Sequence, residues 1–329
     1  MLIAVDAAGG EYAPHEVVKG AIKAAQEYNV DIALVGRRAV LHTLMSRNLN
    51  KPNLTIVEAS QIIGLQESPI KAVRSKPDSS IVVGVDMVKK GTAAAFVSAG
   101  NSGAILSSAL FSLEKIEGVE RPAIASILNF TSTPLLLIDA GANVNCRPRH
   151  LVQFAKLGAI YAEQVLGISS PRVGLLSNGD EETKGNLLVK ESHKLLKKTN
   201  LNFIGNIEGQ DVSRGTADVI VTDGFTGNIV LKALEGLGET LHDLLWQLSP
   251  SFTSNRIQGR LLLHMVGLGS WAKKVDYREY GGACLLGING NVIIAHGRSQ
   301  AKAIKNAIGL AKQTVERGIS QIIREENYE

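Results

Sequence analysis

The stretch Val219–Lys232 reads VIVTDGFTGNIVLK and predicts one strand-loop-helix step of an α/β fold. It opens with a short apolar run, continues through a loop with two glycines, and enters an apolar helical pattern at Gly227. An apolar run without polar alternation is typical of a strand buried on both faces of a sheet. A strand, a glycine-containing loop and a helix in this order are typical of βαβ units.

The same pattern of apolar run and glycine-containing loop recurs along the chain. The other apolar runs are Leu2–Val5, Ala94–Val97, Leu135–Ile138, Val173–Leu176, Phe203–Ile204 and Val292–Ala295. The expected helices are Pro14–Tyr28, Ser80–Lys90, Gly103–Lys115, Pro148–Leu166, Asn186–Thr199, Gly227–Leu248 and Ser299–Gly318. This pattern predicts an α/β fold with a mostly parallel, multi-stranded sheet and helices on both faces. No linker-like stretch interrupts it, so we expect residues 1–329 to form a single interlocked α/β body.

Composition excludes several classes of protein. With 45% hydrophobic and 20% charged residues among 329, the chain is not intrinsically disordered. Two cysteines, Cys146 and Cys284, fit a reducing cytoplasm rather than a disulfide framework. We expect no signal peptide and no transmembrane helix. The net charge of +4 suits an acidic partner or an anionic substrate, whereas no motif points to nucleic acid.

The glycine-containing loops predict a site for an anion. In an open parallel sheet, the loops that follow the strands share one edge, and ligands bind there. We therefore expect the seven loops to converge on one rim. Glycine lets backbone amides approach a ligand closely, and helix N-termini favour negative charge. The set predicts a phosphate or oxyanion site, and the alternative for any single loop is that its glycines close a tight turn.

Two loops carry the candidate catalytic residues. SNGDEETKGN, at Ser177–Asn186, places Lys184 near a helix start, where the helix dipole disfavours a cation unless an anion lies between them. The alternative is a solvated lysine paired with Glu181 or Glu182. Asn228 lies in the first turn of the next helix, where its amide either donates to an oxyanion or caps the loop.

Further loop residues are candidates for binding the substrate and phosphate. They are Gly100, Asn101, Ser102, Gly103, Asp139, Asn143, Gly224 and Gly227. Three aspartates that follow strands, Asp6, Asp139 and Asp223, either orient a ligand or accept hydrogen bonds from their own loops. Each cysteine is either an acyl-accepting nucleophile or an inert buried thiol.

Other chemistries lack their motifs. The sequence has no P-loop, no dinucleotide fingerprint and no nucleophile elbow. No histidine stands near a second histidine or a cysteine at metal-ligand spacing. We therefore expect neither a metal nor a cofactor.

Residues 244–275 contain no aspartate or glutamate and are rich in apolar residues. Ser249–Ser251 should break the segment into two helices. Its cations are Arg256, Arg260, Lys273 and Lys274. Ile257, Leu261 and Met265 lie on one apolar face at helical spacing. One interpretation is a buried or dimer-forming helix. The other is a protruding helical arm over residues 244–280 that contacts a membrane surface or an acidic carrier protein.

Together these motifs resemble one family over nearly the whole chain. It is the bacterial phosphate acyltransferases of phospholipid synthesis, which are acyl-[acyl-carrier-protein]:phosphate acyltransferases. The matching stretches include IAVDAAGGEYAP, KPDSSIVVGVDMVKKG, AFVSAGNSGA, DAGANVNCRPRHLVQFA, EETKGN, DGFTGNIVLK and GGACLLGINGNVIIAHGRSQ. The departures are Ala8 for Met, Glu11 for Asp, Ser102 for Thr, Cys284 for Pro, and SNGDEE for a more typical NIGEEE.

The resemblance implies an isopropylmalate-dehydrogenase/phosphotransacetylase-like fold and a homodimer. It implies transfer of a long-chain acyl group from acyl carrier protein to inorganic phosphate, as the first step of phosphatidic acid synthesis. The acyl phosphate would pass to a membrane glycerol-3-phosphate acyltransferase, so the enzyme would be cytoplasmic and peripherally membrane-associated. It assigns catalysis most directly to Lys184 and Asn228.

Three other functions stay open. They are a phosphotransacetylase-like enzyme that uses an acyl-coenzyme A, a decarboxylating dehydrogenase of similar fold, and a membrane-associated scaffold without activity.

Overall fold

The computed structural model describes residues 1–46, 53–129, 133–252 and 281–326. Its strands are β1 Leu2–Asp6, β2 Asp31–Gly36, β3 Leu54–Glu58, β4 Ala95–Ser98, β5 Ala123–Leu128, β6 Leu135–Ile138, β7 Val173–Leu176, β8 Phe203–Ile207, β9 Val219–Val221, β10 Ala283–Leu286 and β11 Val292–Ile294. Its helices are α1 His15–Tyr28, α2 Arg38–Ser46, α3 Pro69–Ser75, α4 Ser80–Lys89, α5 Ser102–Ser112, α6 Pro148–Gln164, α7 Leu187–Leu196, α8 Gly209–Arg214, α9 Gly224–Phe252, α12 Ala301–Glu316 and α13 Ile319–Glu325.

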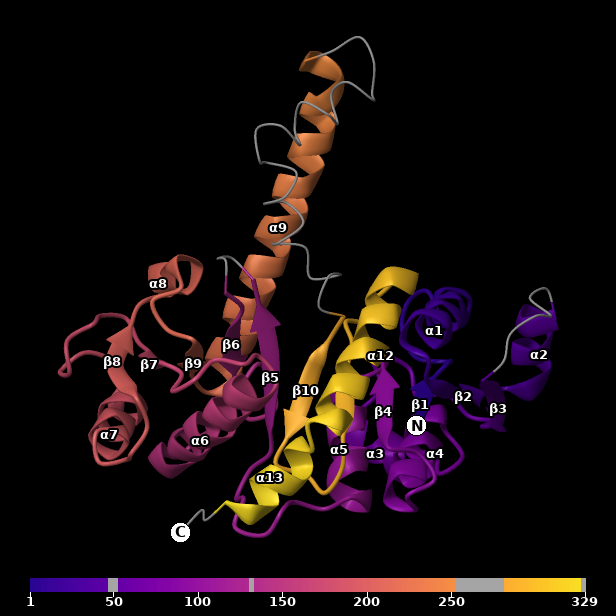
Figure 1. Ribbon diagram of the computed structural model, residues 1–329, viewed down its shortest axis with the longest axis horizontal. Coiled ribbons are helices and arrows are strands. Elements are labelled where there is room, and N and C mark those ends of the chain that lie inside the picture. The colour runs from indigo at the N-terminus through magenta and orange to yellow at the C-terminus, as the bar shows by residue number, and fades with distance from the viewer. Residues whose placement is uncertain (47–52, 130–132, 253–280, 327–329) are drawn as a thin grey trace.

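The strands form one sheet in the order β3-β2-β1-β4-β11-β10-β5-β6-β9-β7-β8, and helices cover both of its faces (Figure 1). Most neighbouring strands are parallel. The predicted α/β class with a mostly parallel sheet is therefore confirmed.

Each face of the sheet has its own apolar core. Successive residues of a strand point to opposite faces, so Ile3 and Val5 join the core beneath α1 and α12, whereas Ala4 joins the core beneath α4 and α5. Both sets of residues are almost fully buried, which explains the continuous apolar runs. Gly84 lets α4 approach the sheet closely, because a Cβ at this position would overlap the buried ring of Phe96.

The sheet reverses direction near its middle. β10 is antiparallel to both β11 and β5, and β5 is antiparallel to β6. The carboxyl ends of β1, β4 and β11 therefore lie at one edge, and those of β6, β9, β7 and β8 lie at the opposite edge. The expectation that all seven loops converge on one rim is wrong. The buried antiparallel strands have the same uninterrupted apolar character as parallel ones, so their direction leaves no mark on the sequence.

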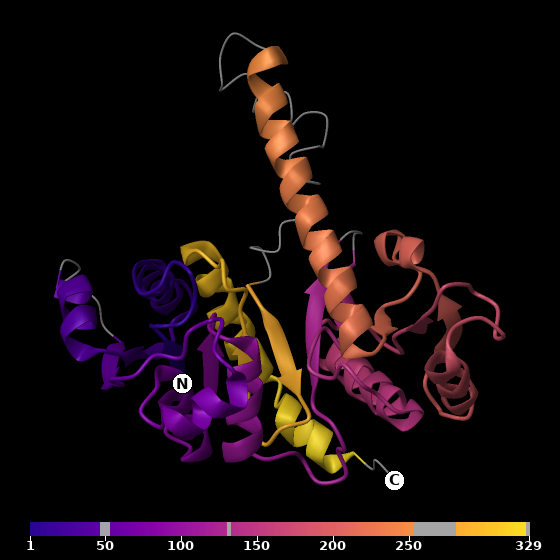
Figure 2. The ribbon, with the colours of Figure 1, turned by 180° about the vertical axis from the view of Figure 1, so that it is seen from behind.

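Helix α9 begins beside the sheet and extends past it (Figure 2), and its side chains contact loops from both edges of the sheet. Its first turns lie beside the loop that follows β6, where Asn228 is next to Gly141. Further along, Glu235 approaches His296 with 3.4 Å between Oε2 and Nε2, and Glu239 accepts hydrogen bonds from Arg298; both of these partners follow β11. One helix therefore brings loops from opposite edges onto the same face.

The end of α9 corrects one expectation and leaves another open. The predicted break at Ser249–Ser251 is wrong, since α9 continues through Pro250 to Phe252. Pro250 lacks a backbone N–H and so costs α9 one hydrogen bond, but the helix ends two residues later and few turns remain to be affected. The predicted contact residues Arg256, Ile257, Arg260, Leu261, Met265, Lys273 and Lys274 lie outside the described residues. Within the described part of the chain, no helix is both long and apolar enough to cross a bilayer.

Candidate active site

The first candidate site is a cavity of about 300 Å³ on the sheet face that α9 crosses, here called the apolar cavity. Its apolar lining comes from β5, α9, β10 and β11 and includes Ile124, Ile127, Leu128, Leu231, Leu234, Ala283 and Ile294. Its polar lining includes Ser102, Asn129, Asn228, Lys232, Glu235 and His296. The cavity thus combines a long apolar surface with a few polar groups, as small-molecule sites do.

Asn228 contributes an amide to this cavity. It lies in the second turn of α9, and among the described residues none hydrogen-bonds its exposed side chain. Gly227 permits this position, because a Cβ there would overlap the backbone carbonyl of Asp139. The Asn228 amide is therefore held on a fixed helix and is available as a donor.

Ser102 reaches the apolar cavity from the start of α5, whereas its neighbour Asn101 is engaged elsewhere. The Asn101 Oδ1 accepts from the backbone N–H of Ala104 at 3.0 Å. Its Nδ2 donates to the backbone carbonyls of Gly64, Leu65 and Glu67 at 3.0–3.3 Å. These contacts make Asn101 the cap of α5 and tie it to the segment 64–67, and Asn101 does not line the apolar cavity. Gly103 allows α3 to approach, because a Cβ there would lie 2.6 Å from Pro69 Cγ.

The predicted residues after β6 and β9 hold two loops together. The buried carboxylate of Asp139 accepts hydrogen bonds from the backbone N–H groups of Ile124, Gly141, Ala142 and Asn143 and from the Asn143 Nδ2. Burial raises the pKa of Asp139, while these hydrogen bonds act in the opposite direction. The backbone N–H of Gly224 in turn donates to the carbonyl of Asn143 at 2.8 Å.

The other two aspartates also accept hydrogen bonds from their own loops. Asp6 accepts from the backbone of Ala8 and Gly9 at 3.0 Å, and its second oxygen accepts from the Ser98 hydroxyl of the neighbouring strand. Asp223 accepts from the backbone of Phe225 and Thr226. The contacts of Asp6, Asp139 and Asp223 therefore fit the second of the two predicted roles, in which each aspartate accepts hydrogen bonds from its own loop.

Lys184 lies on the loop between β7 and α7, at the same sheet edge as the loop of Asn228, because β7 is the neighbour of β9. Its side chain is exposed and does not line the apolar cavity. Within the described residues it forms no ion pair with Glu181 or Glu182. Glu182 instead pairs with Lys197 and approaches His193. The Lys184 loop therefore lies next to the loop that leads into the helix of Asn228, and among the described residues no acid pairs with the Lys184 ammonium.

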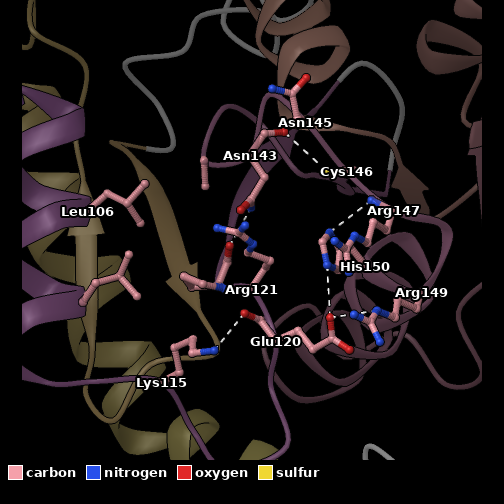
Figure 3. A pocket seen from close by; sticks show the side chains of 13 residues that line it. Leu106, Lys115, Glu120, Arg121, Asn143, Asn145, Cys146, Arg147, Arg149 and His150 are labelled. Carbon is pink, nitrogen blue, oxygen red and sulfur yellow. Dashed lines mark hydrogen bonds and ion pairs between the residues drawn. The ribbon is translucent and has the colours of Figure 1, made fainter.

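A second cavity, of about 790 Å³, is lined by the predicted residue Asn143, but its cationic residues were not predicted (Figure 3). It opens beside the start of α6, and we call it the cationic cavity. Its charged lining consists of Lys115, Arg121, Arg147 and Arg149 with one acid, Glu120. The signal in the sequence is the pair of segments VERP, at residues 119–122, and RPRH, at residues 147–150, which gather cations around two prolines.

Glu120 organises one side of the cationic cavity. Its Oε2 lies 3.0 Å from Arg149 Nε and 3.1 Å from His150 Nε2. The His150 Nδ1 accepts from the backbone N–H of Arg147, which assigns the ring proton to Nε2. Burial lowers the pKa of His150, against the raising effect of Glu120. At neutral pH, His150 is therefore a neutral donor to Glu120.

Both cysteines are poor nucleophiles in this structure. Burial raises the pKa of Cys146 to about 11 and that of Cys284 to about 12. The reactive form of cysteine is the thiolate, so at neutral pH both stay as thiols. In the described part of the chain, no three His, Cys, Asp or Glu side chains gather as metal ligands would.

The fold is that of the phosphotransacetylases. A phosphotransacetylase from Streptococcus pyogenes matches with a TM-score of 0.64 at 16% identity, over 96% of this chain and 94% of that one. Sequence then defines the family more narrowly. Residues 1–322 match the model of the family described as "Fatty acid synthesis protein".

Relatives with high sequence identity are phosphate acyltransferases. The chain is 55% identical to the phosphate acyltransferase of Dehalococcoides mccartyi, over 99% of this chain and 94% of the relative. It is 48% identical to that of Desulforamulus reducens, over 98% and 96%. The chain therefore belongs to the phosphate acyltransferase family and is an acyl-transferring enzyme, which confirms the resemblance seen in the sequence.

Proposed function

We propose that the protein transfers a long-chain fatty acyl group from acyl carrier protein to inorganic phosphate and so forms an acyl phosphate. This reaction would be the first step of phosphatidic acid synthesis. The observation that carries the proposal is the apolar cavity, in which an apolar lining meets the amide of Asn228, which has no partner among the described residues. An aliphatic chain fits such a lining, and the amide suits the carbonyl oxygen of a thioester.

The chemistry needs no covalent enzyme intermediate. A phosphate oxygen attacks the thioester carbonyl carbon, the C–O bond forms, and the carbonyl becomes a tetrahedral oxyanion. The C–S bond then breaks, and the proton of hydrogen phosphate ends on the released thiol. The protein holds the two substrates together and stabilises the oxyanion with fixed donors. The raised thiol pKa values of Cys146 and Cys284 support a mechanism without cysteine.

We assign donor roles to Asn228, Ser102 and Lys184. Asn228 and Ser102 donate to the thioester oxygen or to phosphate from the wall of the apolar cavity. Lys184 neutralises the incoming phosphate, because its ammonium is unpaired among the described residues. The Lys184 loop also lies next to the loop that leads into the helix of Asn228. The other predicted residues, which are Gly100, Asn101, Gly103, Asp139, Asn143, Gly224 and Gly227, shape the loops that carry these donors.

The acyl donor separates this function from that of a phosphotransacetylase. The assay mixes the purified protein with palmitoyl-acyl carrier protein, with and without phosphate, and in parallel with palmitoyl-coenzyme A. Hydroxylamine traps any acyl phosphate as a hydroxamate. We expect phosphate-dependent hydroxamate from the carrier-protein donor alone. Product from coenzyme A alone would favour the phosphotransacetylase-like function, and no product from either would favour the scaffold or the dehydrogenase.

We also propose a homodimer that forms through α9. Phe225, Ile229 and Leu237 lie on one side of this helix and are 53–57% exposed. Their spacing of four and eight residues forms an apolar stripe that a second copy would cover. A Leu237→Glu variant should sediment as a monomer, with Gln26→Glu, an exposed position on α1, as the control. An unchanged sedimentation coefficient for Leu237→Glu would reject this interface.

We further infer that the enzyme is cytoplasmic and associates peripherally with the membrane through the arm of residues 244–280. A long-chain acyl phosphate is an amphiphile, so its transfer to a membrane glycerol-3-phosphate acyltransferase favours release near a bilayer. Charge reversal at Arg256 and Arg260 should reduce binding to anionic vesicles or to acyl carrier protein. Unchanged binding to both would exclude the arm as a contact.

A further inference from the structure

We propose that the cationic cavity binds the phosphate ester of a phosphopantetheine thioester. This inference rests on the proposed function and deepens it, because it places the two ends of one acyl donor. The phosphopantetheine arm would lie in the cationic cavity and the acyl chain in the apolar cavity, with the thioester beside Asn228 between them. Both acyl carrier protein and coenzyme A present this phosphate ester.

The charges of the cationic cavity are unbalanced. Four cationic side chains line it with Glu120 as their counter-charge, and Glu120 is already paired with Arg149. Lys115 donates to the backbone carbonyl of Glu120, so its charge stays uncompensated. Arg121 has neither a hydrogen bond nor an ion pair with the residues that the structure describes. Figure 3 shows Arg121 across the cavity from Arg147.

This arrangement suits a phosphate ester more than a carboxylate or a neutral ligand. A guanidinium presents two parallel donors that match two phosphate oxygens, and such charge-assisted hydrogen bonds are among the strongest in proteins. Arg121 and Arg147 come from segments on opposite sides of the cavity, so a bound phosphate would be held between them. The N-terminus of α6, a helix of 17 residues, begins at the same wall and adds a favourable dipole.

The two cavities adjoin each other. Helix α5 contributes Ser102 to the apolar cavity and, one turn later, Leu106 to the cationic cavity. The loop after β6 contributes Gly141 to the first and the next residue, Ala142, to the second. Asn228 lies against Gly141, 3.6 Å from where a Cβ would stand. A ligand that extends from one cavity to the other therefore passes beside the Asn228 amide.

The size and lining of the cationic cavity also indicate more than a free phosphate ion. Its volume of about 790 Å³ is typical of sites for whole small molecules. Beside the cations, its lining includes the apolar side chains of Leu106, Leu110 and Pro122. These would pack against the uncharged pantetheine part of the ligand, while the cations hold its phosphate.

Binding without turnover tests this inference separately from the proposed function. Isothermal titration calorimetry would measure the Kd of 4′-phosphopantetheine and of pantetheine for the wild type, Arg121→Gln, Arg147→Gln and the exposed control Arg317→Gln. We expect the wild type to prefer the phosphorylated ligand. Each cavity variant should weaken 4′-phosphopantetheine about 10-fold or more and leave pantetheine unchanged, as loss of a hydrogen bond to a charged group does. Equal affinities for both ligands in the wild type would overturn the inference.

Kinetics then test the same site during turnover and compare the two sources of the phosphate ester. The acyl donor is octanoyl-acyl carrier protein at saturating inorganic phosphate, and coenzyme A, 4′-phosphopantetheine or pantetheine is added as an inhibitor. We expect Arg121→Gln to raise KM for octanoyl-acyl carrier protein and to raise the inhibition constants of coenzyme A and 4′-phosphopantetheine, but not that of pantetheine. An equal rise in the inhibition constant of pantetheine would contradict the inference. If octanoyl-acyl carrier protein yields no acyl phosphate in the wild type, the proposed function fails, while the binding measurement still decides the cavity.

Discussion

Replacing Asn228 by alanine should separate activity from stability. The Asn228 side chain is exposed and has no hydrogen-bond partner among the described residues, so its loss removes no contact from the fold. Alanine has a better helix propensity than asparagine, by about 0.5 kcal/mol, so the variant should be as stable as the wild type or slightly more so. Loss of one oxyanion donor should cost roughly 2.7–4 kcal/mol in the transition state, which lowers kcat about 10²- to 10³-fold.

Two measurements on the same samples check this prediction. Calorimetry should give a Tm for Asn228→Ala that is equal to the wild type or higher by about 1 °C. Hydroxamate formation from palmitoyl-acyl carrier protein should fall by at least about 10²-fold. Thr240→Ala, on an exposed turn of the same helix, should keep full activity. Wild-type turnover in Asn228→Ala would refute the assignment, and a loss of activity that only followed a lower Tm would show a structural role instead.

Three further substitutions follow from the same structure. Lys184→Ala should lower kcat by about 10²-fold or more at saturating phosphate. It should leave Tm unchanged, because the exposed ammonium forms no described contact. Unchanged turnover would remove Lys184 from the mechanism. Cys146→Ser should retain activity from pH 7 to 8, because burial raises the pKa of the Cys146 thiol to about 11 and the thiol stays protonated at this pH. A large loss of kcat with an intact fold would indicate that Cys146 is a nucleophile. Asn101→Ala should cost about 2–4 kcal/mol of unfolding free energy, because it removes a helix cap and leaves carbonyls of the segment 64–67 without their donor. Asn186→Ala, a simple cap of α7, should cost about 1 kcal/mol, and equal losses in the two variants would contradict the special role of Asn101.

The sequence predicts individual elements better than their arrangement. The apolar runs mark β1, β4, β6, β7, β9 and β11 within a residue or so, because strands buried on both faces need apolar residues at every position. Strands β2, β3 and β5 were not predicted, because no loop with several glycines follows their apolar runs. Pairing direction is a long-range property, so the reversal at β10, β5 and β6 had to come from the structure.

The sequence predicted only part of the candidate site, because contacts between distant segments leave no local pattern. Loop motifs identified Asn228 and Ser102, which line the apolar cavity, but the same reasoning placed Asn101 beside them. A single sequence does not tell whether an asparagine faces a ligand or the carbonyls of a distant loop. The cations of the cationic cavity were not predicted, because Lys115 and Arg121 lie far in the sequence from Arg147 and Arg149, and single cations in such stretches are typical of solvated loops. Their shared cavity exists only once the sheet has formed.

In the proposed reaction, phosphate, and not water, takes the acyl group from the carrier-protein thioester. The most direct test measures free thiol and acyl phosphate in the same reaction of wild-type protein with palmitoyl-acyl carrier protein, as the concentration of inorganic phosphate is varied. We expect one acyl phosphate for each thiol released, with both rising together until the phosphate concentration is saturating. Thiol release that is independent of phosphate, or that exceeds acyl phosphate from the earliest time points, would contradict it.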